Sequence, residues 1–381
     1  MAIHPPSSIL NPRRILVRGT NWLGDAVMTT PALLRLREQF PESHITLLAP
    51  EKLRDLWLHH PAANETISFA PGEGVFSVGS TLRAGKYDLA LVFPNSPRSA
   101  IETWFAGIPQ RIGYARPWRN FFLTNAIATR AGSVKMQKRS VAEIKALIRG
   151  TGFQPVNHSN TGQRPVPPST AHQIHEYLHL VAALGADSEP LPPQLVVNPD
   201  EIEATKKKFG LDVIRRPIFG LNPGAEYGPA KRWPVEKFIA AARDIQNRTS
   251  CTWLTFGSQA DAALAHRIAS AIASPPYAIW NLAGKTGLRE LMVLLKLCRV
   301  LLTNDSGPMH VAAALGTPVV VPFGSTSPEL TGPGLPGDPR HRLLKSDAPC
   351  SPCFLRECPI DFRCLNGITV ERVVEAVLSV S

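Results

Sequence analysis

The sequence has no long hydrophobic run. None of its apolar stretches approaches the ~18 consecutive residues that a membrane-spanning helix needs. Its first residues, MAIHPPSS, lack a basic segment followed by a long apolar one, so we expect no export signal. These two absences argue against an integral membrane protein and predict a cytoplasmic one.

Signatures of nucleic-acid binding are also missing. The chain has no arginine-rich tail, no zinc-finger pattern and no RNA-recognition signature. Its 41 Lys and Arg against 30 Asp and Glu nevertheless give a net charge of +11, which favours an anionic partner. Nucleic acid is the weaker option, so an acidic membrane surface or an acidic substrate is expected. The basic residues are scattered, with small clusters at 111–119 and 135–139.

Length and composition predict two α/β domains. The 381 residues exceed one ordinary domain, and 44% hydrophobic with 19% charged residues is typical of a soluble globular protein. Apolar strands alternate with helical stretches from residue 14 onward, which predicts a parallel, doubly wound sheet. A second alternating series begins at Pro217. No Gly-x-Gly-x-x-Gly follows the first strand, so no dinucleotide site is expected there.

A polar, proline-rich stretch at 187–199 marks the expected linker. The expected N-terminal domain covers residues 1–190, and the C-terminal domain covers 191–381 and ends in a helix. Residues 151–168 contain two near-copies of one pattern, TGFQPV and TGQRPV. Two copies cannot form a solenoid, so we expect a surface insertion without chemistry.

Three histidines are spaced for one face of a helix expected over 171–184. They are His172, His175 and His179. Such a spacing could ligate a metal, but no further ligand is convincingly placed, which favours a partly exposed helix face.

Four cysteines lie close together near the C-terminus, in the order Cys350-x2-Cys353-x4-Cys358-x5-Cys364. In a cytosolic protein this density suggests structural zinc or an iron–sulfur site more than disulfides. The spacing departs from the paired C-x2-C form of zinc sites, which favours a metal-free, thiol-lined loop.

The stretch LTNDSGPMHVAAALG at 302–316 combines a strand end, a polar turn and a short helix. Ser306 and Gly307 suit an N-cap, and Pro308 suits the first helical position. Gly316 stops the helix. A helix N-terminus at the carboxyl end of a strand favours an anion, so we expect a phosphate-bearing ligand at this turn.

Asp305 and His310 flank the mouth of this turn. With Ser306 they lie too close in sequence for a hydrolase triad, and no Gly-x-Ser-x-Gly elbow occurs in the chain. His310 is better interpreted as a donor to a ligand or to a helix-end carbonyl.

Two further sites carry candidate chemistry. Lys231 and Arg232 lie in a loop rich in Pro and Gly ahead of a helix, where they are either a solvated pair or, as we favour, a phosphate clamp. Asp25 begins a helix after the first strand. It is either a cap or a general base, and the residues alone favour neither.

Three motifs occur in order along the chain. They are LVRGTNWLGD at 16–25, PGAEYGPAKRWP at 223–234 and TNDSGPMH at 303–310. Together they resemble the glycosyltransferase family 9 heptosyltransferases, over essentially the whole chain except 151–168. The resemblance implies a GT-B architecture, in which two Rossmann-like domains hold the active site in the cleft between them.

The resemblance also implies two substrates. The N-terminal domain would receive the acceptor, the heptosyl-Kdo2-lipid A inner core of lipopolysaccharide. The C-terminal domain would hold ADP-L-glycero-β-D-manno-heptose. A family 9 transferase with a different acceptor, or a non-catalytic nucleotide-binding module of the same fold, stays open as an alternative.

Residue roles follow from the same resemblance. Asp25 would be the general base, and Lys231 would neutralise the diphosphate. The residues expected to contact the donor are Glu226, Tyr227, Gly257, Ser258, Asp305, Ser306, Gly307 and His310. Some related enzymes have a carboxylate where this chain has Gln259, which leaves that contact unassigned.

The chemistry of an inverting sugar transfer agrees with these roles. It needs a base for the acceptor hydroxyl and stabilisation of the departing diphosphate. No Asp-x-Asp pair stands out, so we expect no required metal or other cofactor. The positive charge suits an acceptor on an anionic membrane, which predicts a peripheral enzyme on the cytoplasmic face of the inner membrane.

Overall fold

The computed structural model describes most of the chain. The described residues are 11–149, 169–273, 275 and 279–381. The expected insertion at 151–168 lies outside them. Within these ranges, no helix has both the length and the apolar character to cross a membrane.

The chain forms two compact units. The first contains Met1–Ser133 and Thr170–Val196, and the second contains Val134–Ser169 and Val197–Ser381. The sequence predicts one boundary between residues 190 and 191. The structure differs, because the second unit also takes the segment that carries α5 (Val141–Arg149).

Contacts of very long sequence separation place α5 in the second unit. The backbone N–H of Arg139 donates to the carbonyl of Cys353 at 3.0 Å. Its guanidinium Nη1 donates to the carbonyl of Pro349 at 2.7 Å. Ile144 of α5 is buried in the same unit's core. No local pattern signals such contacts, which is why the sequence assigned this helix to the first domain.

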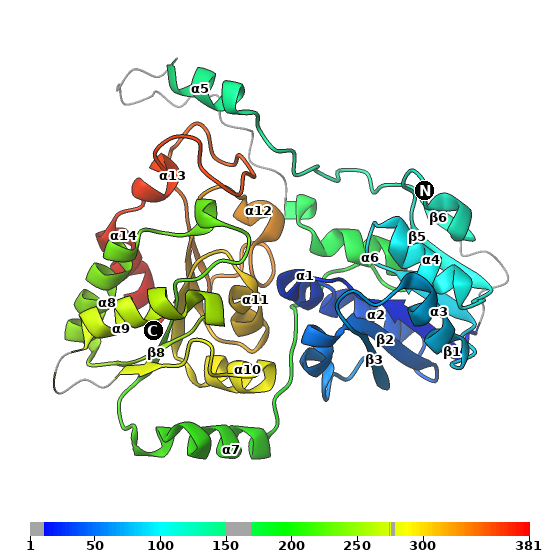
Figure 1. Ribbon diagram of the computed structural model, residues 1–381, viewed down its shortest axis with the longest axis horizontal. Coiled ribbons are helices and arrows are strands. Elements are labelled where there is room, and N and C mark those ends of the chain that lie inside the picture. The colour runs from blue at the N-terminus through cyan, green and yellow to red at the C-terminus, as the bar shows by residue number, and fades with distance from the viewer. Residues whose placement is uncertain (1–10, 150–168, 274, 276–278) are drawn as a thin grey trace. The chain divides into compact units, whose positions relative to one another are not determined.

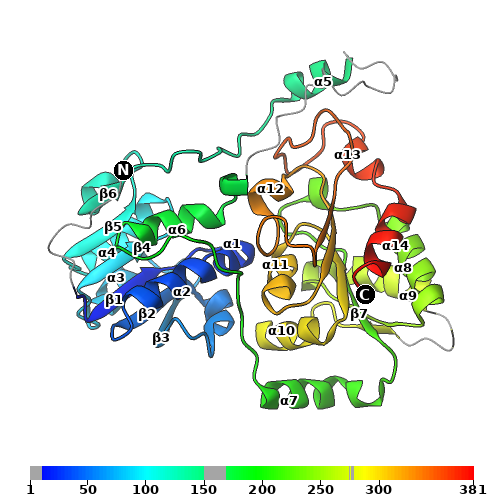
Figure 2. The same cartoon turned by 180° about the vertical axis from the view of Figure 1, so that it is seen from behind.

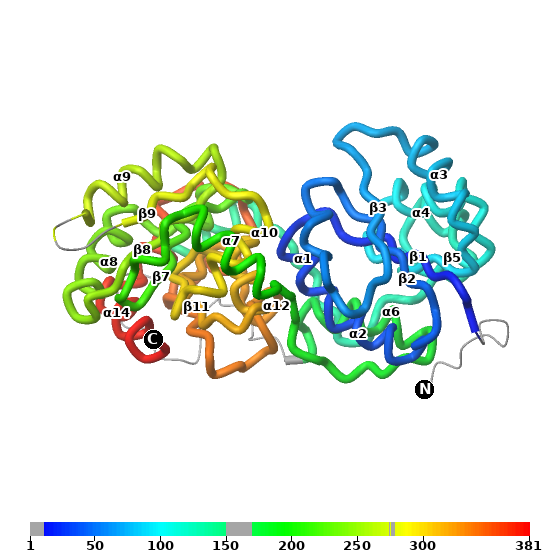
Figure 3. The backbone as a smooth tube through the Cα atoms, turned by 90° about the horizontal axis from the view of Figure 1, so that it is seen from below, coloured from blue at the N-terminus to red at the C-terminus, as the bar shows by residue number. Residues whose placement is uncertain are grey.

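The first unit is built on a six-stranded parallel sheet in the order β3-β2-β1-β4-β5-β6. Its strands are β1 (Arg14–Arg18), β2 (His44–Pro50), β3 (Glu65–Phe69), β4 (Leu89–Val92), β5 (Gln110–Tyr114) and β6 (Asn125–Ile127). The order reverses between β1 and β4, as in doubly wound folds. Figure 3 shows helices on both sides of the strands, which explains why β1 is apolar throughout its middle.

Helices of the first unit form two groups. On one side lie α3 (Val75–Arg83) and α4 (Pro97–Phe105), which pack together, and on the other lie α2 (Thr30–Gln39) and α6 (Ile174–Ala182) (Figure 3). A short α1 (Leu23–Met28) precedes α2. Pro31 lies in the first turn of α2, where it starts a second helix instead of kinking a single one.

The second unit repeats this plan. Its parallel sheet has the order β12-β11-β10-β7-β8-β9. The strands are β7 (Ile218–Asn222), β8 (Thr252–Thr255), β9 (Ile279–Asn281), β10 (Val300–Thr303), β11 (Val319–Pro322) and β12 (Arg342–Leu344). Two doubly wound sheets confirm the predicted α/β class.

Helices also cover both faces of the second sheet (Figure 1 and Figure 2). One face carries α8 (Val235–Thr249), α9 (Ala262–Ile272) and α14 (Val370–Leu378). The other carries α10 (Leu288–Leu297), with α7 (Pro199–Phe209) beside it, and α11 (Gly307–Ala314). The remaining helices are α12 (Pro328–Thr331), α13 (Arg363–Asn366) and the 3-10 turns Glu51–Trp57, Asn120–Phe122, Ser169–Ala171, Leu211–Val213, Pro229–Lys231 and Gln259–Asp261.

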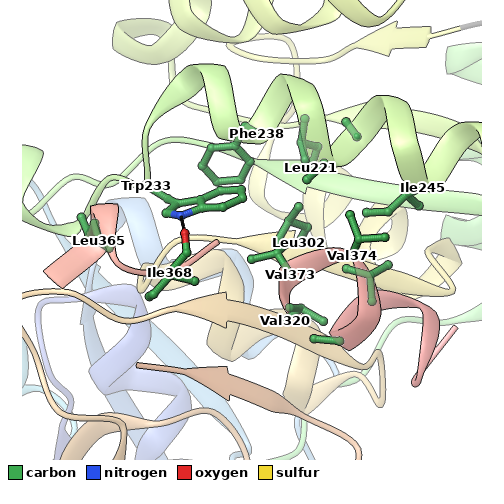
Figure 4. Close-up of a cluster of buried hydrophobic side chains, with 14 of the residues drawn as sticks. Leu221, Trp233, Phe238, Ile245, Leu302, Val320, Leu365, Ile368, Val373 and Val374 are labelled. Atoms are coloured by element: carbon green, nitrogen blue, oxygen red, sulfur yellow. Dashed lines mark hydrogen bonds between the residues drawn. The ribbon is translucent and has the colours of Figure 1, made fainter. Parts of the chain in front are cut away.

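The core of the second unit lies between its sheet and the helices α8 and α14 (Figure 4). Phe238 of α8 and Val373 of α14 are fully buried there. Trp233, just before α8, is also buried, and its indole Nε1 donates to the carbonyl of Ile368 at 3.1 Å. An unpaired buried N–H would cost about 1–3 kcal/mol. This bond therefore anchors the end of the 223–234 loop.

Candidate functional site

The predicted strand, turn and helix at 302–316 are present as β10 and α11. Ser306 is the N-cap residue, yet its side chain makes no capping hydrogen bond. Its Oγ instead accepts from Nδ2 of Asn222, at 3.0 Å, and Pro308 lies in the first turn. The Ser306 side chain therefore does not occupy the first amides of α11. Pro308 has no N–H, and the N–H of Met309 donates to the carbonyl of Ser306 at 3.1 Å, so it is the helix dipole that favours an anion at this end.

Lys231 and Asp305 meet at the start of α11. Their Nζ and Oδ2 atoms are 2.6 Å apart, and the two side chains are only 15% and 5% exposed. The hydroxyl of Thr326 donates to the same carboxylate oxygen. The structure thus brings the 223–234 loop to the α11 turn and fixes an ammonium beside it. His310, also predicted for this site, is buried within α11.

Tyr227 packs between two cations. Its ring centre is 4.9 Å from Nζ of Lys231 and 5.3 Å from the guanidinium carbon of Arg356. Its hydroxyl donates to the carbonyl of Phe354 at 2.8 Å. Burial raises the pKa of the Tyr227 phenol, although the charge of Arg356 opposes this, so the ring stays neutral and attracts both cations.

Arg356 is a candidate that the sequence did not reveal. It comes from the cysteine-rich segment, and its backbone carbonyl accepts from Ala230 at 3.0 Å. Gly228, in the same loop, has a φ of 149°, and a Cβ there would lie 2.5 Å from the Arg356 carbonyl. This close approach of two backbones needs a glycine, which is the one local signal the sequence offered.

Lys231 and Arg232, predicted as one phosphate clamp, point to different partners. The guanidinium of Arg232 lies 3.3 Å from Oδ1 of Asp261 and donates to the carbonyl of Ala225 at 3.2 Å. Arg232 therefore ties the 223–234 loop to the turn after β8. Of the predicted pair, Lys231 alone lies at the start of α11.

The turn after β8 contains the carboxylate that the sequence did not place. Asp261 accepts from the backbone N–H of Ser258 at 3.1 Å and from its hydroxyl at 2.7 Å. Two glycines leave room for it, since a Cβ on Gly224 or Gly257 would lie 2.6 Å or 2.9 Å from Asp261 atoms. Ser258, which the sequence predicts to contact the donor, is thus held in place by Asp261. Glu226, also predicted for the donor, is exposed in its loop.

Asp25 lies in the first turn of α1 in the first unit. The amide Nε2 of Gln173 donates to its Oδ1 at 3.3 Å and to the hydroxyl of Tyr177 at 2.9 Å. Burial first, and then the charge of Asp25, raise the pKa of Tyr177 well above its usual value. A neutral phenol and an amide therefore flank the carboxylate. The sequence missed both, because they are 148 residues and more away from Asp25.

Arg18 holds the loop that leads to Asp25. Its Nε lies 2.8 Å from Oε2 of the buried Glu102. Its Nη1 donates to the carbonyl of Gly19 at 2.6 Å and to Oδ1 of Asn21 at 3.0 Å. Glu102 also pairs with Arg98, whose Nε lies 2.8 Å from Oε1, whereas Glu102 is the carboxylate partner of the buried Arg18. Removing Glu102 would therefore leave the Arg18 charge buried without that partner, which is strongly destabilising. This ion pair therefore fixes the backbone ahead of α1.

The four clustered cysteines line one small cavity of about 10 Å³. All four are free thiols, and burial raises the pKa of Cys364 to about 12. In the described part of the chain, no three His, Cys, Asp or Glu side chains are arranged to hold a metal ion. That finding covers the four thiols and the three histidines.

The histidine helix is shorter than predicted. The structure has α6 at Ile174–Ala182, and His172 lies before it as a buried residue. The ring of His179 stacks on Tyr114 at 5.9 Å between centres. At least two of the three rings therefore have packing roles in the first unit.

Comparison with known proteins gives the family. The model of glycosyltransferase family 9 (heptosyltransferase) matches residues 75–149 and 151–362. The chain is 33% identical over 331 residues to lipopolysaccharide heptosyltransferase 2 of Escherichia coli, covering 84% of this chain and 85% of that protein. The Salmonella typhimurium protein of the same name is 34% identical over 329 residues, with the same coverage.

A solved structure agrees with these matches. The structure described as E. coli ADP-heptose lps heptosyltransferase II aligns with a TM-score of 0.73 and 30% identity, covering 96% of this chain and 98% of that one. Its agreement with the two doubly wound sheets confirms the GT-B fold class. The chain belongs to glycosyltransferase family 9, the heptosyltransferase family.

Proposed function

We propose that this enzyme transfers L-glycero-D-manno-heptose from ADP-heptose to heptosyl-Kdo2-lipid A, the reaction of a lipopolysaccharide heptosyltransferase II. The observation that carries the proposal is the ammonium of Lys231, held by Asp305 beside the start of α11. This arrangement suits a sugar diphosphate. The choice of acceptor rests on the relatives named heptosyltransferase 2.

The second unit, which contains Lys231 and α11, stabilises the leaving group. As the bond between the anomeric carbon and the diphosphate oxygen breaks, ADP gains negative charge. Lys231 and the positive end of the α11 dipole offer positive charge to that oxygen or its neighbours. The neutral ring of Tyr227 and the guanidinium of Arg356 lie beside the ammonium. We therefore propose that turnover needs no metal ion, so that a chelator leaves the rate unchanged.

Asp25 supplies the base. Its carboxylate takes the proton of the acceptor hydroxyl while the oxygen forms the new bond to the anomeric carbon, with inversion. The Gln173 amide donates to one oxygen of this carboxylate and so orients it. One proton moves from the acceptor hydroxyl to Asp25. The bond from the anomeric carbon to the acceptor oxygen forms as the bond from that carbon to the diphosphate oxygen breaks, and ADP leaves.

A direct assay tests the function. Purified protein with ADP-heptose and heptosyl-Kdo2-lipid A should release ADP and lengthen the core by one heptose. No release with any core acceptor would refute the transferase proposal. Asp25→Asn keeps the shape of the side chain but removes the base, so turnover should be lost while ADP-heptose still binds. Equal loss of donor binding would contradict the base role.

A second acceptor is the main alternative. A heptosyltransferase I reaction would use the same donor but an acceptor without the first heptose. A panel of truncated cores separates the two, because the preferred acceptor gives the highest kcat/KM. Membership of the heptosyltransferase family sets aside the other alternative, a non-catalytic nucleotide-binding module.

A further inference from the structure

The first unit carries two strongly exposed aromatic side chains on one turn. Trp118 and Phe121, between β5 and β6, are 82% and 86% exposed. The turn is ordered by hydrogen bonds: the N–H of Arg116 donates to Oδ1 of Asn120 at 2.9 Å, and the N–H of Phe122 donates to the carbonyl of Arg119 at 3.0 Å. The exposed rings are therefore held in place by a fixed backbone.

More exposed aromatic surface adjoins this turn. Trp104 of α4 is 46% exposed and makes an edge contact with Phe122, with ring centres 5.5 Å apart. Phe76 of α3 is 61% exposed and makes a similar contact with Phe105 at 4.9 Å. The helices α3 and α4 lie side by side (Figure 3). We call Phe76, Trp104, Trp118 and Phe121 the aromatic face.

The chain segment around Trp118 and Phe121 is purely basic. No Asp or Glu occurs from residue 103 to residue 142. The cations of the first unit in this stretch are Arg111, Arg116, Arg119 and Arg130. Such a one-sided charge distribution attracts an anionic surface.

Arg119 strengthens this charge from beneath the turn. Its side chain is fully buried, and its Nε and Nη2 have no hydrogen-bond partner among the described residues. Nη1 donates to Oδ1 of Asn95 at 3.3 Å, a neutral acceptor. Burial lowers the pKa of Arg119 to about 10, which leaves it charged at neutral pH. Trp118, next to it, adopts a left-handed φ of 64°, which bulky residues rarely do.

We propose that the aromatic face and its arginines dock the enzyme on an anionic lipid bilayer. Tryptophan and phenylalanine suit the boundary between lipid headgroups and acyl chains, and arginines nearby suit acidic headgroups. Large exposed aromatics such as Trp118 and Phe121, on a stretch without Asp or Glu, fit this partner better than a second protein surface. The proposal deepens the proposed function, because it rests on an acceptor that is anchored in a membrane.

Vesicle binding of the full-length protein tests the docking surface. The probes are phosphatidylcholine vesicles with and without phosphatidylglycerol. Wild type should co-sediment with the anionic vesicles far more than with the neutral ones. The double variant Trp118→Ser/Phe121→Ser should lower the partition coefficient about tenfold or more, since two aromatic side chains no longer enter the lipid. Val213→Ser is the matched control, because Val213 is 73% exposed in the second unit and should not matter.

A spectroscopic variant reports the contact itself. The emission of Trp118 should shift to shorter wavelength on anionic vesicles. Trp118→Phe keeps an aromatic ring, so vesicle binding should persist while that part of the shift is lost. Wild-type binding by the double variant, or no binding of wild type to anionic vesicles, would overturn the proposal. The second result would favour a protein partner for this face.

The two proposals fail separately. With a deacylated acceptor in solution, wild type and the double variant should transfer heptose at equal rates. Absence of transfer in both, with intact vesicle binding, would refute the proposed function alone. Loss of transfer only in the double variant would assign the face to the acceptor sugars and overturn the docking role. Melting curves of both proteins check that the variant is folded.

Discussion

Lys231 is the residue on which the donor chemistry depends. Its ammonium lies 2.6 Å from Asp305 and 4.9 Å from the ring centre of Tyr227, so its position is fixed before substrate binds. A charge already in place stabilises a departing diphosphate without reorganisation. Asp305 offsets part of that charge, and the positive end of the α11 dipole adds to what remains.

Lys231→Ala should lower kcat about 10²–10³-fold, the usual cost of losing one group that stabilises developing negative charge. Arg232→Ala is the matched control. Because Arg232 pairs with Asp261, it should cost far less in kcat. Lys231→Ala also leaves Asp305 buried and unpaired, which should destabilise the protein by about 3 kcal/mol. Assays therefore run well below its melting temperature. A wild-type kcat would contradict the role of Lys231.

Gln173 is expected to act through Asp25. Gln173→Leu removes the amide donor and should lower kcat, while KM for ADP-heptose stays unchanged. Gln173→Glu adds a negative charge beside the carboxylate, which favours its protonated form. The acidic limb of the pH–rate profile should then move to higher pH. A purely structural Gln173 would lower both variants' stability but leave the limb where it is.

The elements that carry the site were largely predictable because their signals are local. The capping residues and Gly316 predicted α11, and apolar runs predicted β1 and β10. The alternation of strands and helices predicted two doubly wound sheets. Each signal depends on neighbours within a few residues, so it survives without knowledge of the fold.

The contacts between elements were not predictable. Gln173 reaches Asp25, Arg356 reaches Tyr227 and Glu102 pairs with Arg18, all across long stretches of chain. Polar side chains such as Gln or Arg occur on many surfaces, so nothing in their sequence neighbourhood distinguishes these. Only the tertiary packing selects them.

Gly228 joins two such elements, the 223–234 loop and the cysteine-rich segment. A Cβ at this position would meet the backbone carbonyl of Arg356 at 2.5 Å, and the φ of 149° is itself unfavourable for other residues. Gly228→Ala should therefore destabilise the protein by about 1–3 kcal/mol and weaken ADP-heptose binding, because Lys231 follows in the same loop. Calorimetry measures both effects.

Gly287→Ala is the matched control for Gly228→Ala. Gly287 lies in the same unit as Gly228, its φ is negative, and the atom nearest to an added Cβ would be 3.8 Å away. We expect Gly287→Ala to change the free energy of unfolding by no more than about 1 kcal/mol and to leave donor binding normal, because Gly287 is only the N-cap residue of α10. Equal effects of the two substitutions would contradict the close approach at Gly228.

At the scale of the whole molecule, a buried histidine with a lowered pKa occurs in each unit. His60 lies in the first unit and His341 in the second, and burial lowers the pKa of each to about 4. In each ring Nδ1 accepts a backbone hydrogen bond at 3.3 Å, from Ala62 and Val319 respectively. Protonation at Nδ1 would break that bond and place a charge in the core.

The stability of both units should therefore fall in acid. Between the unfolded pKa of about 6.5 and the folded value of about 4, the unfolded state binds more protons than the native state. The contribution of each neutral histidine to the free energy of unfolding, about 3 kcal/mol, is complete above pH 6.5 and is lost as the pH falls towards 4.

Urea unfolding across this pH range, followed by probes in each unit, measures the loss. His60→Gln should flatten the pH dependence of the first unit and His341→Gln that of the second, whereas the exposed His266→Gln should change neither. If none of these substitutions alters the slope of the free energy of unfolding against pH, the acid sensitivity belongs to other groups.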